Sequence, residues 1–263
     1  MPRHPKAYVR PAKLSEASEI TDVLTRAFIN DPTMCFYGGV PALVKDPAHP
    51  TLAEQKTIQE LRVFMAAMVK IPGLVRGNID VVAIPIDHDA SSAKPESKER
   101  IAAVAMWLPP GVSLDFSLAT MLRAGALKIA FSWGLTSVKR LGGDYTAAVE
   151  GSLAREFKAH NLPRPDSWHL FMIAVDTDQQ GAGYSSMLFR EGFHRASPSP
   201  CHLTASKPKN KDIYEHFGFE LVDTHVVGVG EVNADGIKAR HDAAVGVPGF
   251  VMIKASLKIT IGG

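Results

Sequence analysis

The sequence has little of several features that mark particular protein classes. Its 263 residues include only two cysteines, Cys35 and Cys201, which lie too far apart to indicate a disulfide framework or a metal site. There is no run of about 18 apolar residues for a membrane span, and the basic N-terminus lacks the apolar stretch of a signal peptide. Lys and Arg number 29 against 27 Asp and Glu, which gives no reason to expect nucleic-acid binding. We therefore expect a cytoplasmic protein with neither nucleic acid nor membrane as a partner.

Histidine occurs ten times, but never in a pattern typical of a metal site. No two histidines have the spacing His-x-x-x-His. Glu191 and His194 stand three residues apart, which would place two ligands on one helix face, but no second pair completes the coordination. We expect no metal.

Apolar residues make up 46% of the chain, enough for a sizeable core. Their periodicity predicts a strand, two helices, two strands, a helical segment, a strand, a helix, a strand, a helix and two strands. The strands at 80–86 and 101–108 should pair antiparallel across a polar loop at 87–100. This order is typical of an α/β (α+β) fold, a mixed sheet with helices on both faces. We expect a single domain over 1–263, with helical insertions at about 40–75 and 112–166.

Local signals refine these two insertions. The Pro- and Gly-rich segment 32–50 predicts a loop, and Thr51-Leu52-Ala53-Glu54 then forms a capping box that should begin a helix. Glycines interrupt the helical pattern of residues 114–160, which predicts two or three short helices. Two prolines in 161–167 indicate a linker into the next strand.

The most informative stretch is Trp168–Ala196. An apolar run, Leu170–Val175, predicts a buried strand, and a polar turn, Asp176–Gln180, follows it. Gly181 and Gly183 then open a segment with helical period. The unpaired N–H groups at the start of a helix, together with its dipole, favour an anion, and glycine lets the backbone approach it closely. The stretch therefore predicts a phosphate-binding turn.

Two common phosphate motifs do not fit this turn. A dinucleotide-binding motif needs Gly or Ala at position 186, where Ser186 stands, and a carboxylate about 20 residues on, but there is none near Thr204. A P-loop needs Lys followed by Ser or Thr after the glycines, and no such pair occurs.

The run from Val175 to Ser185, VDTDQQGAGYS, instead resembles motif A of the GNAT superfamily of N-acetyltransferases, Gln/Arg-x-x-Gly-x-Gly/Ala. Gln180 and Gly183 match the motif, and Ser185 takes the place of its final Gly or Ala.

Two further regions extend the resemblance. Residues 204–219, with Asn210, Tyr214 and the closing Gly218-Phe219, resemble motif B of the same superfamily. The segment 106–111, MWLPPG, and Arg26-Ala27-Phe28 before Asp31-Pro32 are similar to the branch that includes puromycin acetyltransferase. The resemblance is best over Trp168–Phe219 and loose over 38–78 and 112–166.

The resemblance implies a mixed, mostly antiparallel sheet of about six or seven strands with a splayed central strand pair. It also implies that acetyl-CoA is the co-substrate. Its pantetheine arm would lie along Ile173, Ala174 and Val175, with the Val175 N–H near the thioester oxygen. Its pyrophosphate would lie on the turn formed by Gln180, Gly181, Ala182, Gly183, Tyr184 and Ser185. The Ser185 hydroxyl either crowds this phosphate or donates to it, and its small size favours donation.

The resemblance also assigns candidate roles in catalysis. Tyr214 stands where the superfamily usually has its general acid, and a phenol with a pKa near 10 is protonated at neutral pH. The alternative is that Tyr214 only packs its helix against the sheet. Asn210 either bonds the pantetheine or caps the helix.

The general base is not evident from the sequence. His169 is the only titratable side chain on the strand 168–175, and its ordinary pKa suits a base. Asp176 and Asp178 lie in the turn, where loop solubility and helix N-terminal charge explain them. An acceptor amine of low pKa would need no base.

Four aromatic residues are candidates for an acceptor pocket, with core packing as the alternative for each: Phe28, Phe36, Tyr37 and Trp107. Trp133 and the second helical insertion are expected to cover the substrate side.

The expected function is acetyl-CoA-dependent N-acetylation of a small-molecule amine by a monomer or homodimer, with Tyr214 as general acid. One alternative is a protein or peptide N-acetyltransferase. The other is a non-catalytic acyl-CoA-binding regulatory module, which Ser185 and the lack of a carboxylate on the central strand would suit.

Overall fold

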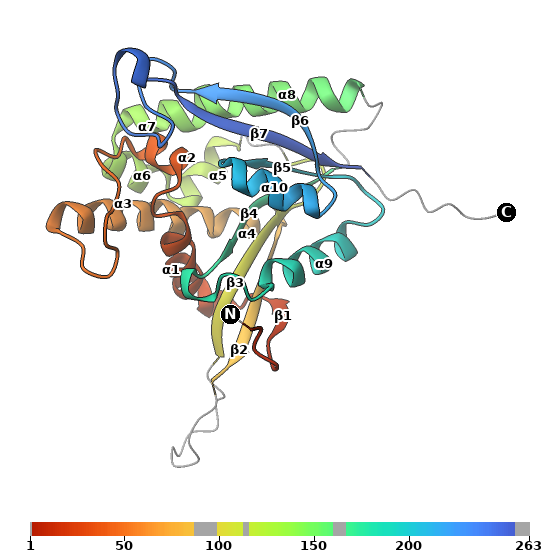
Figure 1. Cartoon of the computed structure of the whole chain (residues 1–263). Coiled ribbons are helices and arrows are strands. Elements are labelled where there is room, and N and C mark those ends of the chain that lie inside the picture. Colours follow the sequence, from red (N-terminus) through yellow and green to blue (C-terminus); the bar gives the residue numbers. More distant parts are fainter. Residues whose placement is uncertain (1, 87–98, 113–115, 160–166, 256–263) are drawn as a thin grey trace.

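The computed structural model describes residues 2–86, 99–112, 116–159 and 167–255 (Figure 1). Its strands are β1 (Tyr8–Pro11), β2 (Asn78–Pro85), β3 (Glu99–Leu108), β4 (Trp168–Val175), β5 (Cys201–Ala205), β6 (Glu220–Val227) and β7 (Val247–Lys254). Its α-helices are α1 (Ala17–Phe28), α2 (Pro32–Gly38), α3 (Leu52–Met68), α4 (Lys70–Leu74), α5 (Leu118–Ala124), α6 (Ala126–Trp133), α7 (Leu135–Lys139), α8 (Thr146–Ala159), α9 (Tyr184–Ala196) and α10 (Pro208–His216). Most of the predicted loop 87–100 and of the linker 161–167 lies outside the described residues.

The seven strands form one sheet in the order β1-β2-β3-β4-β5-β7-β6. Every neighbouring pair is antiparallel except β4 and β5, which are parallel. The predicted mixed, mostly antiparallel sheet is therefore confirmed. The antiparallel pairing of the strands predicted at 80–86 and 101–108 is confirmed as well.

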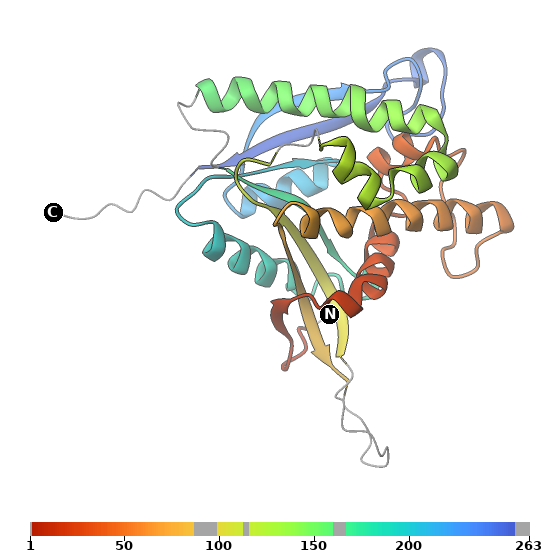
Figure 2. The same ribbon diagram turned by 180° about the vertical axis from the view of Figure 1, so that it is seen from behind.

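Helices cover both faces of the sheet, as predicted. Strand β3 is buried along most of its length, and its side chains alternate between two cores. Val104 and Met106 pack with residues of α1 and α3, whereas Ala103 and Ala105 pack with residues of α9. Figure 1 shows α9 and α10 on the near side, and Figure 2 shows α3 and α5–α7 on the opposite side.

The capping box is confirmed at the start of α3. The Thr51 hydroxyl accepts from the Glu54 N–H at 3.3 Å, and the Glu54 carboxylate accepts from the Thr51 N–H at 2.9 Å. The predicted loop at 32–50 is partly wrong, because residues 32–38 form α2. Asp31 caps this helix and Pro32 is its first residue, an arrangement that favours a helix start.

The second insertion holds more helix than predicted. It forms α5, α6, α7, a π-helical turn (Arg140–Tyr145) and the 14-residue α8, instead of two or three short helices. Gly125 and Gly134, both with positive φ, separate α5 from α6 and α6 from α7. Helix α8 runs along β6 and β7 (Figure 2). Within the described residues, no helix is long and apolar enough to cross a membrane.

Helix α9 is held tightly against the sheet. A Cβ at Gly192 would come within 2.3 Å of the Trp107 ring, so the close approach requires glycine there. Arg195 donates two hydrogen bonds, at 2.7 and 2.8 Å, to the buried Asp80 carboxylate of β2. These contacts fix the direction in which the start of α9 points.

Candidate active site

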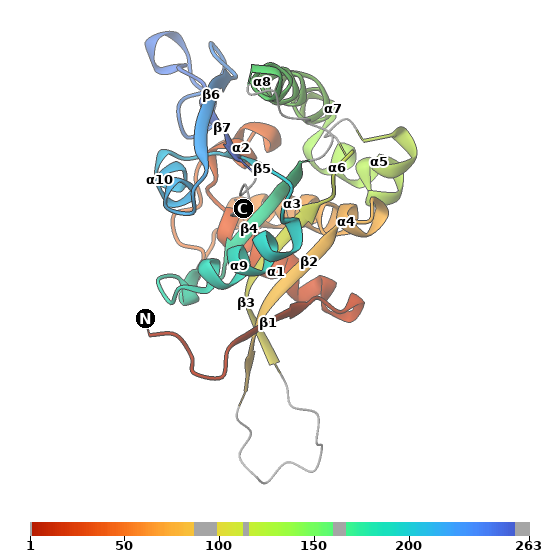
Figure 3. The ribbon, with the colours of Figure 1, turned by 90° about the vertical axis from the view of Figure 1, so that its right-hand side faces the viewer.

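The sheet opens between its two parallel strands. Strands β4 and β5 pair only at Trp168–Cys201 and His169–His202, and no described strand pairs with the same edge of β4 beyond that point. The Asp176 N–H donates to Ala102 of β3, at the opposite edge. Because N–H groups alternate along a strand, those of Val175 and Ile173 face the open edge. This is the splayed strand pair that the resemblance implies: Figure 1 shows the two strands diverging, and Figure 3 shows β4 from another side.

The turn after β4 presents the N-terminus of α9. Gly181 and Gly183 have φ values of 79° and 75°, in the left-handed region that favours glycine. Gly183 is the N-cap residue of α9, and no side chain caps this end of the helix. The first N–H groups of α9, which include those of Tyr184 and Ser185, therefore have no capping side chain. The predicted phosphate-binding turn has the backbone geometry that an anion site needs.

Asp176 has a different role from the one predicted. It is not a soluble loop carboxylate: its side chain is buried and accepts hydrogen bonds from Arg26 of α1 at 2.8 and 2.7 Å and from Arg100 of β3 at 3.1 Å. Burial alone would raise the pKa of Asp176, but the two guanidinium groups outweigh it and hold the pKa below its ordinary value. Asp176 therefore anchors the start of the turn as a carboxylate. Asp178 is half exposed and pairs with Arg100.

The N-terminal segment also reaches this turn, which the sequence did not indicate. The Arg3 guanidinium donates to the carbonyl oxygens of Ala182 at 3.4 Å and Gly183 at 3.2 Å. The His4 N–H donates to the Tyr184 hydroxyl at 3.1 Å. The segment thus adds an exposed cation at the start of α9. No local pattern in residues 2–7 signals a contact with a turn about 180 positions away.

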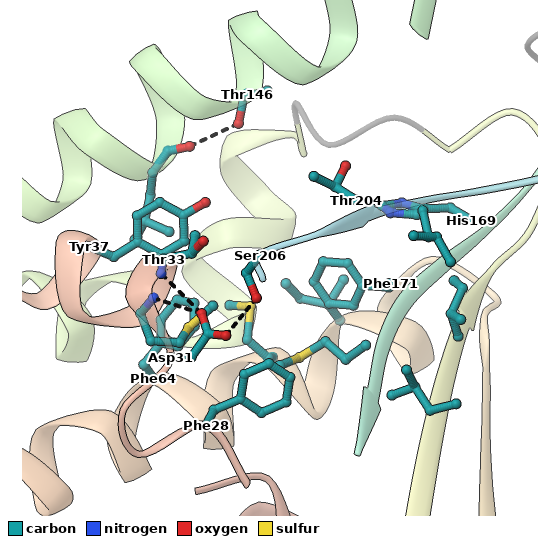
Figure 4. Close-up of a pocket in the computed structure, with 18 of the residues that line it drawn as sticks. Phe28, Asp31, Thr33, Tyr37, Phe64, Thr146, His169, Phe171, Thr204 and Ser206 are labelled. Carbon is teal, nitrogen blue, oxygen red and sulfur yellow. Dashed lines mark hydrogen bonds between the residues drawn. The ribbon is translucent and has the colours of Figure 1, made fainter. Parts of the chain in front are cut away.

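A cavity of about 400 Å³ lies beside the open edge of β4. Aromatic and aliphatic side chains of α1, α3, α5, α6 and β4 make up most of its wall, as Figure 4 shows in part. Among the described residues that line it, Asp31 is the only Asp, Glu, Lys or Arg. Ile173 of β4 and Tyr214 of α10 also line it. The cavity therefore connects the unpaired strand edge with a buried carboxylate and a phenol.

The Asp31 carboxylate is held in a defined position. One oxygen accepts from the N–H groups of Thr33 and Met34, at 3.0 and 3.3 Å, as the N-cap of α2. The other accepts from the Ser206 hydroxyl at 2.6 Å (Figure 4). It also lies 3.9 Å from the Lys207 ammonium. Asp31 is only 2% exposed, and its burial raises the pKa despite these partners. Asp31 is not among the predicted site residues, although its place before Pro32 does signal a helix cap.

Tyr214 and Asn210 lie together on α10 and both line the cavity. Burial, with a smaller contribution from the Asp31 carboxylate, raises the pKa of Tyr214 above its ordinary value of 10.0. Tyr214 therefore carries its proton at neutral pH. The Tyr214 ring also packs against Phe189 and Phe219. Tyr214 can therefore help to pack α10 and still offer its hydroxyl to the cavity.

His169 lines the cavity at the point where β4 and β5 separate. It is buried, and its ring stacks on that of His202, with centroids 4.5 Å apart and planes 17° apart. The Ser167 hydroxyl lies 3.0 Å from the His202 Nδ1.

The candidate aromatic residues divide between cavity and core. Phe28 and Tyr37 line the cavity. Trp107 and Phe36 are buried in the core, Trp107 behind α9. Trp133 stacks on Phe64, with centroids 4.7 Å apart, and so joins α6 to α3. The second insertion does contribute wall residues to the cavity, namely Phe116, Met121, Ala126, Ile129, Val138, Leu141 and Thr146.

The described residues contain no group of three or more His, Cys, Asp or Glu side chains that could hold a metal ion. Glu191, one of the two residues at metal-ligand spacing, accepts from Arg195 at 3.3 Å. Cys35 and Cys201 are both buried free thiols.

Known proteins resemble this chain in part of the sequence and across the fold. No protein-family model matches the chain. Over 120 residues it is 28% identical to an uncharacterised N-acetyltransferase of the fission yeast Schizosaccharomyces pombe, a match that covers 45% of this chain. The match spans about half of that relative, 47% of its length.

Two solved structures share the fold over nearly the whole chain. One is described as a histone acetyltransferase HPA2 and related acetyltransferase from Corynebacterium glutamicum; it covers 97% of this chain and 99% of its own, with a TM-score of 0.53 and 22% identity. The other is a mosquito arylalkylamine N-acetyltransferase like 5b. The match covers 95% of this chain and 99% of the mosquito protein, with a TM-score of 0.51 and 14% identity. The chain has the GNAT-like α/β fold of N-acetyltransferases.

Proposed function

We propose that this protein is an acetyl-CoA-dependent N-acetyltransferase whose acceptor is a small amine with an apolar body. One observation carries the proposal. A single cavity joins the unpaired edge of β4, the Asp31 carboxylate and the Tyr214 phenol. An acetyl donor along the strand edge and an amine beside Asp31 would therefore meet in one enclosed space.

The donor side suits acetyl-CoA because it offers backbone donors instead of charged side chains. The Ile173 and Val175 N–H groups face the gap, and the N-terminus of α9 lies beyond the turn. The pantetheine arm fits an unpaired strand edge, and the pyrophosphate fits an open helix N-terminus. Acetyl-CoA supplies a thioester carbonyl carbon as the electrophile. The Val175 N–H would donate to the oxygen of that carbonyl, where negative charge develops.

The acceptor side suits an amine because Asp31 is the only Asp, Glu, Lys or Arg among the described residues that line the cavity. Asp31 attracts an ammonium group into a wall that is otherwise mostly apolar, and it can take the proton that frees the nitrogen lone pair. The amine nitrogen then bonds to the thioester carbon as the carbon–sulfur bond breaks. The Tyr214 hydroxyl would donate its proton to the departing sulfur, and the resulting phenolate would take back the second proton that the nitrogen loses as the amide forms. Asp31, instead of His169, is the base that we propose.

The experiment measures thiol release from acetyl-CoA with aryl-alkyl amines, polyamines and lysine-containing peptides as acceptors. We expect aryl-alkyl amines to give the highest kcat/KM. A preference for peptides would favour the alternative of a protein acetyltransferase. If acetyl-CoA raises the melting temperature but no amine releases thiol, the protein is a binding module and the proposal fails.

Asp31→Asn tests the role of the carboxylate. An asparagine keeps the helix cap, so the fold should survive, while kcat/KM should fall about 100-fold or more if the base is lost. In the wild type, activity should rise with pH as Asp31 loses its proton, at a pH above its ordinary pKa of 3.8. Asp46→Asn, which changes an exposed carboxylate outside the cavity, is the control. Equal activity of both variants would exclude Asp31 as the base.

A further inference from the structure

The outer side of the α5–α7 insertion is unusually apolar for an exposed surface. Phe131, Leu135 and Leu118 are 89%, 81% and 75% exposed. We define the outer face of the insertion by its five exposed large apolar residues that do not line the cavity: Leu118, Leu122, Leu127, Phe131 and Leu135. Single exposed apolar residues are normal, but five within 18 positions on consecutive short helices are more than chance exposure explains and indicate an interaction site.

Helical spacing places these residues away from the core. Leu127 and Phe131 are four positions apart on α6, so they share one side of the helix. Ile129, on another side, is buried in the core that includes α3, and Trp133 stacks on Phe64 of α3. The inner side of the insertion is therefore covered by the protein. In Figure 2 helices α5–α7 lie on the near side of the molecule, between α3 and α8.

Between the acidic residues Asp115 and Asp144, the charged residues of the insertion all have one sign. Residues 116–143 contain Arg123, Lys128, Lys139 and Arg140 and no Asp or Glu. Arg140 is partly buried and pairs with Glu231. Arg123, Lys128 and Lys139 are exposed, and within the described residues no ion pair involves any of the three. Three unneutralised cations thus accompany the apolar outer face.

We propose that the outer face of the insertion docks onto the surface of an anionic lipid bilayer. Exposed Leu and Phe beside Lys and Arg are typical of helices that lie in the membrane interface, and each cation gains from the negative surface potential. Lysine is instead depleted in protein–protein interfaces. A symmetric contact with a second copy through this face would gather the three cations of both copies into one interface. The docking is superficial, because no described helix spans a membrane.

The test is flotation of the full chain with vesicles, without acetyl-CoA or amine, so its result does not depend on catalysis. We expect the protein to float with vesicles of phosphatidylcholine and phosphatidylserine, and much less with phosphatidylcholine alone or in high salt. Leu127→Gln with Phe131→Gln should lower the partition coefficient about tenfold or more. Both side chains are exposed, so the melting temperature should not change.

Two further variants test separately whether binding depends on the position of the apolar residues and on the three cations. Leu14→Gln replaces an almost fully exposed leucine outside the insertion, and it should float like the wild type. The triple change Arg123→Gln, Lys128→Gln and Lys139→Gln should abolish the preference for phosphatidylserine. Equal flotation of the wild type and the Leu127→Gln/Phe131→Gln variant would overturn the proposal. So would a dimer that this double variant dissociates, if the wild type does not float.

Discussion

The two sides of the cavity are built in different ways. The donor side consists of consecutive backbone, from β4 through the Gly181–Gly183 turn into α9, and its polar groups are N–H groups at a strand edge and a helix end. The acceptor side consists of side chains from α1, α3, the α5–α7 insertion, β5 and α10. The donor side depends on backbone geometry within one stretch, whereas the acceptor side depends on how distant elements pack.

Because of this difference, substitutions on the two sides should affect the binding of different substrates. Backbone donors bind any ligand with the same phosphate and amide groups, so the donor side suits a common co-substrate. The acceptor side can change with any residue of its wall, so it sets which amine enters. Changes at the donor side should therefore alter the KM for acetyl-CoA, and changes at the acceptor side the KM for the amine. The predictions below test that separation.

Tyr214 lies where the two sides meet, and its loss should have the largest effect on rate. Tyr214→Phe removes only the hydroxyl, so packing against Phe189 and Phe219 should persist. We expect kcat to fall about 100-fold, the usual contribution of a positioned acid, with little change in either KM. Initial-rate kinetics measure this, with Tyr8→Phe as a control outside the cavity. Unchanged kcat would mean that Tyr214 serves packing alone.

Asp176 should dominate the stability of the donor side. Asp176→Asn leaves Arg26 and Arg100 without their carboxylate, and we expect a loss of about 1.5–2 kcal/mol of unfolding free energy at pH 7. This loss is at the low end of the range for hydrogen bonds to charged groups, because both arginines are partly exposed to solvent. Urea unfolding measures it. Asp178→Asn, at a half-exposed ion pair, should cost less than about 1 kcal/mol.

The difference in unfolding free energy between the wild type and Asp176→Asn should depend on pH. The folded-state pKa of Asp176 lies below its ordinary value of 3.8. Its stabilising effect is therefore complete above the unfolded-state pKa and is lost as the pH falls through the folded-state pKa. The wild type and Asp176→Asn should therefore converge in stability as the pH falls through and below the folded-state pKa of Asp176. A constant difference over this pH range would contradict the ion-pair account.

Gly183→Ala should weaken the donor side alone. An alanine at φ 75° is strained by about 1 kcal/mol, and its Cβ would lie 2.8 Å from the Arg3 guanidinium. We expect the KM for acetyl-CoA to rise about fivefold while the KM for the amine stays constant. Gly73→Ala, at a site with an ordinary φ and open space, is the matched control. A rise in the amine KM instead would break the separation of the two sides.

The same contrast explains how much could be predicted from sequence. Motif A and the apolar strand before it are contiguous, so Trp168–Val175 and Gly181–Gly183 were predicted from local pattern and resemblance. The order of helices and strands along the chain followed from periodicity, whereas the mostly antiparallel sheet with its splayed central pair was implied by the resemblance. Whether the predicted donor residues bind acetyl-CoA stays a prediction, as does the single domain over 1–263.

The acceptor side could not be predicted because its residues come together only in the fold. Asp31 is recognisable as a helix cap, but nothing local indicates that Ser206, 175 positions away, donates to it. Trp107 and Phe28 look alike as aromatic candidates, yet the first lies behind α9 and the second lines the cavity. Asp176 looked like a solvated turn residue because its two arginine partners stand on α1 and β3.

Arg3 gives the smallest predicted effect and tests whether the donor side extends beyond its contiguous stretch. Its guanidinium is exposed and held only by two carbonyl oxygens, so Arg3→Ala should raise the KM for acetyl-CoA only about threefold at low salt. Because exposed charges are screened, the effect should vanish at high salt. Lys56→Ala, an exposed cation on α3, is the control. A lower KM in Arg3→Ala would mean that the N-terminal segment obstructs the phosphate turn, and the donor side would then be complete within Trp168–Ala196.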